Sequence, residues 1–338
     1  MWQIKLHYHN PYTDTYMPRP NDPVDLRLIS KVSSLYYYQN LNQQAIAKRL
    51  QLSRLKISRL LKQARDQGIV QISIAFPDDN FIGLETKLEE KYHLKEVVIV
   101  ESSISENSIS ESLIQRQLGL AAANFLHRSI SEGDVIGLTW GTTLQAMIDS
   151  VQPKPTKDLH VIQTLGGVGP PEAKAHATDI SRRLSNLLGS KLNLLPAPGI
   201  VESVEAKNVL LSDRRVRSTL DLFSKINTLY VGLGALNTNP VLIKDNHEIS
   251  SQLQQEILKS DAVGDIGLNF FNANGDEVNT KFKDLIIGIS MEELKKVDTV
   301  VGIAGGAQKL HSIAGALKGK LIDVLIVDNH TAQKLLAS

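Results

Sequence analysis

The apolar positions between residues 24 and 76 recur at three- and four-residue steps, which is the spacing of short amphipathic helices. Asn42 and Ser53 stand where they can cap two consecutive helices, and residues 51–53 form a short turn between these helices. Residues 69–76 then alternate between apolar and polar side chains, as a strand does. Two helices joined by so short a turn and followed by a strand predict a winged helix-turn-helix.

A different pattern begins near residue 84 and continues to the end of the sequence. Short apolar runs such as EVVIV alternate with helical spacing, and most of them lead through a glycine-containing loop into the next helix. The clearest cases are DVIGLTWGTT, HVIQTLGGVG, TLYVGLGAL and TVVGIAGGAQK. Such runs with helices between them are typical of a parallel sheet that is covered on both faces. We therefore expect an α/β protein whose second domain is Rossmann-like.

These patterns divide the chain of 338 residues into four segments. They are a flexible tail (1–23), a winged helix-turn-helix domain (24–76), a linker (77–83), and a ligand-binding and oligomerisation domain (84–338). The tail is rich in Pro, Asn, Asp and Tyr and shows no period. A chain of this length accommodates two domains of ordinary size.

The charge is distributed unevenly between the two domains. The whole chain has a formal net charge of +1, but residues 24–76 contain nine basic and two acidic residues, a net charge of +7. Residues 77–338 consequently carry a net charge of −6. A compact basic domain on a larger acidic one indicates that the basic domain contacts a polyanion.

The basic residues gather on the second helix of the expected helix-turn-helix, directly after its turn. In this motif the second helix lies in the major groove of double-stranded DNA with its N-terminal residues nearest the bases. Arg54 can form a bidentate contact with a guanine edge, and the amino end of the preceding helix can meet a phosphate. The predicted DNA-binding residues are Gln43, Gln44, Ser53, Arg54, Lys56, Ile57, Ser58 and Arg59.

Ligands of open parallel sheets bind beyond the carboxyl ends of the strands, where glycines permit a close approach and helix N-termini favour anions. Here Lys309 can supply a positive charge, and Asp265 can accept hydrogen bonds from sugar hydroxyls. Taken singly, each glycine loop is also explained as a tight turn against the sheet. The residues expected at the ligand site are Gly141, Thr142, Thr143, Gly166, Gly167, Gly234, Asp265, Gly305, Gly306 and Lys309.

Several classes of function lack their characteristic residues. The chain contains no cysteine, which excludes disulfides, thiolate zinc sites and a cysteine nucleophile. No GxSxG or HExxH motif occurs, and the nine histidines are scattered without metal-ligand spacing, so we expect no catalytic residue, no cofactor and no metal. No apolar run is long enough to span a membrane, and no signal peptide is recognisable, so we expect a cytoplasmic protein without membrane contact.

The motifs of both domains occur in an order that resembles the SorC family of bacterial sugar-responsive transcriptional regulators. In the basic domain the resemblance rests on LYYYQNLNQQAIAKRLQLSRLKISRLLKQARDQGIVQISI. In the second domain it rests on IGLTWGTTL, LPAPG, VGLGAL, AVGDIG followed by FFNANGD, and GIAGGAQK. The resemblance covers roughly residues 26–336 and leaves only the tail outside.

The resemblance implies a second domain similar to sugar-phosphate isomerases and glucosamine-6-phosphate deaminase that serves as a sensor. It implies phosphorylated sugars or related metabolites as effectors, and dimers or tetramers. Position by position, residues 141–143 match the loop that holds the effector or its phosphate, Asp265 matches the acid that binds effector hydroxyls, and Lys309 matches the lysine after the double glycine. Ala307-Gln308 stands where some relatives have an acidic residue, which leaves the identity of the effector open.

The sequence thus predicts a homo-oligomeric regulator of a carbohydrate-utilisation operon that binds operator DNA and a phosphorylated sugar. We expect the helices around 109–130 and 203–224 to supply the main interface between copies. The alternative is a sugar-phosphate isomerase or deaminase with a fused DNA-binding domain. That reading needs an acid/base pair, and only Asp265 offers itself. A nucleotide-binding enzyme is a third possibility, but the chain lacks a complete phosphate-binding fingerprint.

Overall fold

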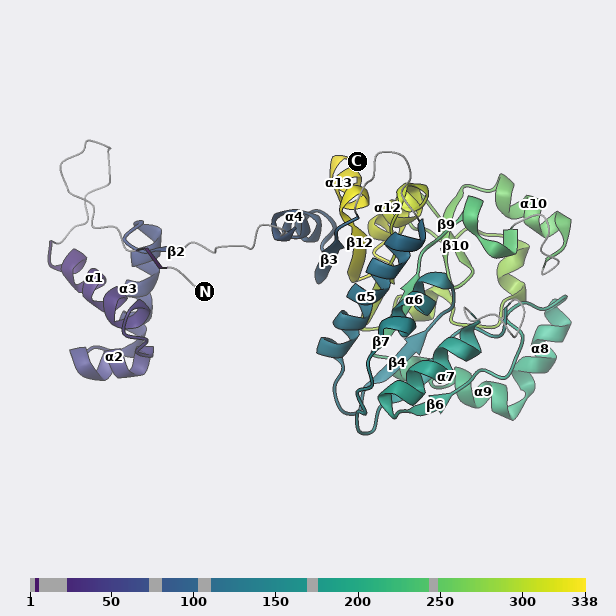
Figure 1. Ribbon diagram of the computed structural model, residues 1–338, viewed down its shortest axis with the longest axis horizontal. Helices are drawn as coiled ribbons and strands as arrows, with labels where there is room; N and C mark the ends of the chain where they lie inside the picture. The colour runs from purple at the N-terminus through teal and green to yellow at the C-terminus, as the bar shows by residue number, and fades with distance from the viewer. Residues whose placement is uncertain (1–3, 6–22, 73–80, 103–110, 169–175, 243–248) are drawn as a thin grey trace. The chain divides into compact units, whose positions relative to one another are not determined.

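The computed structural model describes residues 4–5, 23–72, 81–102, 111–168, 176–242 and 249–338 (Figure 1). The chain divides into two compact units, Met1–Asn80 and Phe81–Ser338. We call them the head and the body and describe each by itself.

The described part of the head contains three helices and a two-stranded antiparallel sheet. The helices are α1 (Pro23–Tyr37), α2 (Gln43–Leu50) and α3 (Arg54–Asp66), and strand β1 (Ile4–Lys5) pairs with strand β2 (Gln71–Ile72). The second and third helices are joined by residues 51–53, the three residues that the sequence assigns to the turn between them.

The helices of the head begin at the residues that the sequence indicates. The Asn42 side chain accepts a hydrogen bond from the Ala45 backbone N–H at 2.9 Å, and the Ser53 hydroxyl accepts one from the Lys56 backbone N–H at 3.2 Å. Each bond satisfies one of the amides that a helix leaves unpaired at its start. The three helices bury a shared apolar core of Ile29, Val32, Leu35, Ile46, Ile57, Leu60, Leu61 and Ala64.

The strand of the head differs from the expectation. Of the strand predicted over residues 69–76, only Gln71–Ile72 is a strand among the described residues, and residues 73–76 lie outside them. Its partner, Ile4–Lys5, belongs to the segment that the sequence assigns to an irregular tail. A strand of two residues leaves no alternation to detect, so only the pairing itself reveals it.

The body is built on a sheet of seven strands, and all neighbouring strands are parallel, as the apolar runs predict. The strands are β3 (Glu96–Val100), β4 (Val135–Leu138), β5 (His160–Gln163), β6 (Lys191–Asn193), β7 (Thr228–Gly232), β11 (Thr299–Ile303) and β12 (Val324–Asp328). Their order across the sheet is β3-β12-β11-β7-β4-β5-β6.

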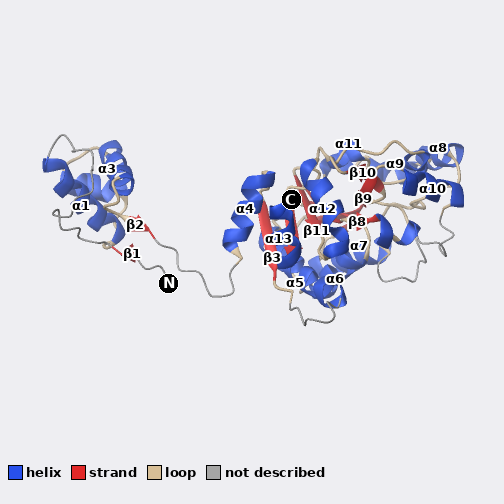
Figure 2. Ribbon diagram, turned by 90° about the horizontal axis from the view of Figure 1, so that it is seen from above, coloured by secondary structure: helices blue, strands red, loops and turns tan. Residues whose placement is uncertain are grey.

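Helices cover both faces of this sheet, and two separate apolar clusters form beneath them. Residues of α5, α6 and α7 belong to one cluster, and residues of α4, α9, α11, α12 and α13 belong to the other. Figure 2 shows α5 and α6 on one side of the strands and α11 and α12 on the other. The helices are α4 (Ile82–Tyr92), α5 (Glu111–Ser129), α6 (Thr142–Ser150), α7 (Ala177–Leu188), α8 (Val204–Ser212), α9 (Arg214–Leu220), α10 (Ser251–Lys259), α11 (Met291–Leu294), α12 (Leu310–Lys318) and α13 (Asn329–Ala337).

A second sheet of three antiparallel strands follows the centre of the large one. It consists of β8 (Gly234–Ala235), β9 (Ala262–Ile266) and β10 (Asn269–Asn272), in the order β10-β9-β8. Because β8 starts two residues after the end of β7, this small sheet begins at the carboxyl edge of the large one.

Two boundaries differ from those expected. Residues 203–224 form two short helices, α8 and α9, because the Asp213 backbone leaves the helical conformation and its carboxylate accepts hydrogen bonds from the first amides of α9. Helix α4 begins at Ile82, inside the segment 77–83 that the sequence assigns to a linker. Residues 77–80 of that segment lie outside the described residues.

The strand order places a topological switch point between β4 and β7. From β4 the chain proceeds through β5 and β6 toward one edge of the sheet, and from β7 it proceeds through β11 and β12 in the opposite direction. In open α/β sheets the connections diverge at such a point and leave a crevice at the carboxyl ends of the strands, which is where ligands bind.

Candidate functional site

Loops from four adjacent strands meet at the switch point. Residues 139–141 follow β4, Leu233 follows β7, residues 164–168 follow β5, and residues 304–306 follow β11. The structure thus brings together, on one edge of the sheet, the glycine loops that are separated by up to 165 positions in the sequence. This clustering follows from parallel strands, whose carboxyl ends share one edge.

The loop after β4 delivers the start of a helix to this edge. Gly141 precedes α6 with a φ of 115°, in a region that favours glycine. Thr142 is the first residue of α6, and its hydroxyl oxygen accepts a hydrogen bond from the Gln115 side-chain amide at 3.3 Å. Thr143 is buried. The amino end of α6 therefore points its free amides toward the switch point.

Asp265 is held firmly in β9 beside this edge. Its carboxylate is 5% exposed and accepts hydrogen bonds from the Asn239 side-chain amide at 2.8 Å and from the Leu268 backbone N–H at 3.0 Å. Burial raises the pKa of Asp265, while the two hydrogen bonds and the charge of Lys309 act in the opposite direction. The side chain is oriented before any ligand arrives.

The position of Asp265 depends on a glycine in the neighbouring strand. A Cβ at Gly234, in β8, would lie 2.0 Å from the Asp265 Oδ1 atom. Gly234 pairs directly with Asp265 across the small sheet. Its role in the site is therefore to leave space for the carboxylate.

Lys309 supplies the positive charge at the end of the loop after β11. It precedes α12 and is partly exposed. Loss of hydration lowers the pKa of Lys309, and the nearby charges of Glu111 and Asp265 partly restore it. In the part of the chain that the structure describes, no carboxylate lies within ion-pair distance of the Lys309 ammonium.

Other predicted glycines hold the loops to the body. The Gly166 backbone N–H donates to the Ile287 carbonyl, and the Gly167 N–H donates to the Ala197 carbonyl, each at 2.9 Å. The Gly306 N–H donates to the carboxylate of Asp328 at 2.7 Å. These three amides are engaged within the protein, so a ligand contact with them remains a prediction.

Gly305 shows the same close packing. A Cβ at Gly305 would lie 2.5 Å from the Asp328 carboxylate, so this position has no room for a side chain. Gly305 and Gly306 thus hold the loop after β11 close to Asp328 at the start of α13. Lys309 comes three residues after Gly306, directly before α12.

Two residues at the switch point were missed by the sequence reasoning. Asn239 orients Asp265, and its own carbonyl oxygen accepts from the Val241 backbone N–H at 2.9 Å, which sets the amide orientation. Thr139 follows β4 directly, and its hydroxyl is buried without a hydrogen-bond partner among the described residues. Thr139 lies within the motif LTWGTT and Asn239 lies two residues beyond the motif VGLGALN, but nothing in their spacing distinguishes them.

His176 caps the helix that follows it. It precedes α7, and its Nδ1 atom accepts a hydrogen bond from the Thr178 backbone N–H at 3.3 Å. The ring is buried against Gly167, where a Cβ would lie 3.1 Å from its Nε2 atom.

In the head, the outer face of α3 carries the polar residues that the sequence predicts for DNA. Arg54, Lys56, Ser58 and Arg59 are all exposed. Ile57 is the correction: it is 0% exposed and belongs to the core of the head, so it does not face DNA. The helical period explains this, because position 57 lies on the same face as Leu60, Leu61 and Ala64.

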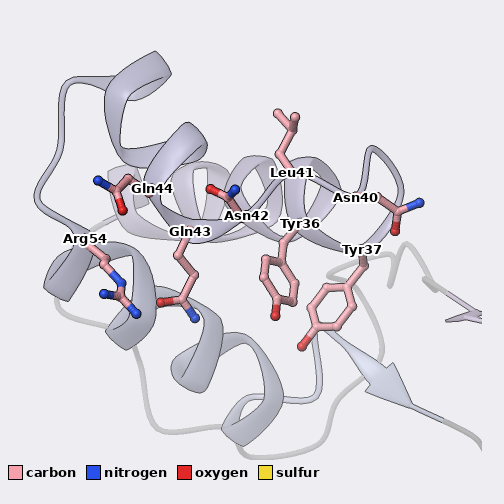
Figure 3. Close-up of a pocket in the computed structure, with 8 residues that line it drawn as sticks. All are labelled: Tyr36, Tyr37, Asn40, Leu41, Asn42, Gln43, Gln44 and Arg54. Carbon is pink, nitrogen blue, oxygen red and sulfur yellow. The ribbon is translucent and has the colours of Figure 1, made fainter.

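A groove of about 610 Å³ opens among the three helices of the head. It is lined by Tyr36, Tyr37, Asn40, Leu41, Asn42, Gln43, Gln44 and Arg54. In Figure 3 the side chains of Gln43 and Arg54, from α2 and α3, extend into the same space. The predicted residues on both helices thus border one surface, which the amino end of α2 also reaches.

The described residues include no group of three acidic or histidine side chains placed to hold a metal ion. Among the same residues, no helix combines the length and the apolar character that a membrane span requires.

Comparison with known proteins identifies the family. The model of the family described as "Putative sugar-binding domain" matches residues 79–337. The solved structure of the full-length sorbitol operon regulator SorC from Klebsiella pneumoniae aligns with 94% of this chain and 100% of its own, with a TM-score of 0.70 and 27% identity. The chain belongs to the SorC family of sugar-responsive transcriptional regulators.

Other transcriptional regulators match this chain as well. The deoxyribonucleoside regulator of Bacillus subtilis is 30% identical over 91% of this chain and 97% of its own length. A DeoR family transcriptional regulator from Listeria monocytogenes aligns with 75% of this chain and 98% of its own, at 29% identity and a TM-score of 0.68. These relatives are regulators rather than enzymes, which decides against the isomerase or deaminase alternative.

Proposed function

We propose that the body binds a phosphorylated sugar, or a related phosphorylated metabolite, at the switch point between β4 and β7. The observation that carries this proposal is the setting of Lys309. Its pKa is lowered by loss of hydration, and among the described residues its ammonium has no ion-pair partner. A partly desolvated cation that no carboxylate contacts directly favours an incoming anion.

The remaining groups of the site can bind different parts of the ligand. The amino ends of α6 and α12 present partial positive charge to a phosphate, next to Lys309. Asp265 retains lone pairs on both oxygens after its two internal hydrogen bonds, so it can accept hydrogen bonds from sugar hydroxyls. This arrangement suits a ligand with a phosphate at one end and hydroxyls at the other.

Thermal-shift screening with paired sugars and sugar phosphates, followed by calorimetry, tests this proposal. Lys309→Met should weaken the phosphorylated ligand at least tenfold, which corresponds to about 1.4 kcal/mol. Lys318→Met is the matched control, because Lys318 is an exposed lysine at the other end of the same helix. Equal affinity for a sugar and its phosphate in the parent protein would refute the phosphate assignment.

We also propose that the head is a winged helix-turn-helix that binds operator DNA through α3. The exposed cations of α3 and the groove beside α2 support this proposal. Arg54→Ala should cost about 1–3 kcal/mol of operator binding and relax the preference at one base pair. Arg27→Ala, which removes an exposed arginine of α1, should keep the sequence preference. If Arg54→Ala binds operator and scrambled DNA as the parent does, α3 is not the recognition helix.

We further propose that the protein acts as a homo-oligomer, either a dimer or a tetramer, because one head covers only a single half-site. Exposed apolar side chains support an interface on the body. They are Leu113 and Leu120 on α5 and Val204 and Val209 on α8. Light scattering at micromolar concentration should give at least the dimer mass, with or without the effector, and a monomer in both states would contradict this.

The family resemblance implies a body similar to sugar-phosphate isomerases and glucosamine-6-phosphate deaminase, and we propose that this body holds its effector without converting it. A proton transfer needs a second group besides Asp265. Among the described residues, both hydrogen bonds to Asp265 come from amides, which cannot serve as that group. NMR of the best ligand, incubated with the protein for hours, should show it unchanged. Conversion in proportion to protein, lost in Asp265→Asn, would contradict this.

A further inference from the structure

Leu55 lies at the centre of the face of α3 that points away from the core of the head. Successive residues of a helix are about 100° apart, so the buried positions of α3 share one direction and Leu55 lies almost opposite to it. The side chain is 65% exposed. The buried positions are Ile57, Leu60, Leu61 and Ala64.

The neighbours of Leu55 are polar or cationic. Arg54 and Lys56 flank it in the first turn of α3, which contains no acidic residue, and Ser58 and Arg59 follow one turn later. All four are exposed. The cations around Leu55 disfavour an apolar protein surface as its binding partner. They favour a polyanion, and Leu55 can then pack against a small apolar group that the polyanion presents. In the major groove of DNA that group is the C5-methyl of thymine.

We propose that Leu55 contacts a thymine methyl in each half-site and so helps to determine which sequence is bound. This inference rests on the proposed DNA-binding function of α3. Arg54 and Leu55 then divide the recognition between them, since the guanidinium donates hydrogen bonds to a base edge and the leucine packs against the methyl.

The test begins with the selection of bound sequences from a random pool of DNA duplexes by the full-length protein. Each thymine of one selected half-site is then replaced in turn by deoxyuracil, which removes the methyl and keeps the base pairing. At one position this replacement should lower the affinity of the parent protein about fourfold, equivalent to about 0.8 kcal/mol for one buried methyl group.

The variants show whether Leu55 is responsible for that loss. Leu55→Ala should bind the thymine half-site about as weakly as the parent binds the uracil one, and should show no further loss with uracil. Leu55→Met keeps an apolar side chain and should retain the sensitivity. Leu26→Ala, the control, removes another leucine of the head, 41% exposed on α1, and should behave as the parent does.

Two results would overturn the inference while DNA recognition by the head stands. One is a parent protein that binds every uracil duplex as well as its thymine counterpart, and the other is a Leu55→Ala variant that keeps the parent's sensitivity. If the pool yields no preferred sequence, the proposed DNA-binding function fails, and the inference fails with it.

Discussion

Gly234→Ala tests how the switch-point site is held together. The added methyl would lie 2.0 Å from the Asp265 Oδ1 atom, so the carboxylate must leave its place. Gly234 does not have a positive φ, and the backbone therefore accepts alanine without strain. Any loss comes from the displaced carboxylate alone.

The magnitude follows from the bonds that Asp265 makes. It accepts two hydrogen bonds, from Asn239 and from Leu268, and hydrogen bonds to charged groups contribute roughly 1.5–3 kcal/mol each. Loss of one or both lowers the free energy of unfolding of the body by about 1.5–6 kcal/mol. For a unit of this size the melting temperature then falls by roughly 3–24 °C.

Scanning calorimetry of the full chain, followed through the transition of the body, measures this change. Gly232→Ala is the matched control, because Gly232 lies only two residues before Gly234. Its added Cβ would lie 3.8 Å from the Trp140 carbonyl oxygen, which is an ordinary van der Waals contact. The control should remain within about 1 kcal/mol of the parent. If Gly234→Ala melts with the control, Asp265 is not held as we describe.

Three further predictions address other parts of the chain. Asn42→Ala should lower the stability of the head by about 1 kcal/mol, because the first turn of α2 loses its cap, as chemical denaturation can measure. Gly141→Ala should cost roughly 1–3 kcal/mol in thermal unfolding, because alanine at a φ of 115° is strained although the space is open. Burial raises the pKa of Asp265, so the native state binds this proton more tightly than the unfolded chain does. The free energy of unfolding should therefore decrease as the pH rises from the usual aspartate value to the raised one, and effector affinity should increase over the same interval. Asp265→Asn should remove both pH dependences in calorimetry.

The sequence predicts most of this fold because its signals are local. A run such as EVVIV indicates a buried strand by composition alone, and Asn42 and Ser53 act on amides three residues away. The placement of Gly141 and Lys309 at one end of the body also follows from the pattern, since parallel strands share a carboxyl edge. Asp265 instead lies within a strand of the small antiparallel sheet, which that rule does not cover.

The features that the sequence does not predict depend on contacts between distant residues. The amide of Gly166 is engaged by Ile287, which lies more than a hundred positions away, and Asn239 reaches Asp265 from another loop. Ile57 follows Lys56 in the sequence, yet the helical period turns it into the core. A position next to an exposed lysine therefore did not make Ile57 a DNA-facing residue, because the direction of its side chain on the helix determines its burial.

The most direct test of the account is operator binding measured by fluorescence anisotropy while the best sugar phosphate is titrated. If the switch point is the effector site, the ligand changes the operator affinity of the parent protein by at least fivefold, in one direction or the other. Asp265→Asn should bind the operator as the parent does without ligand and show no change when the ligand is added. A ligand response in Asp265→Asn equal to that of the parent would contradict the account.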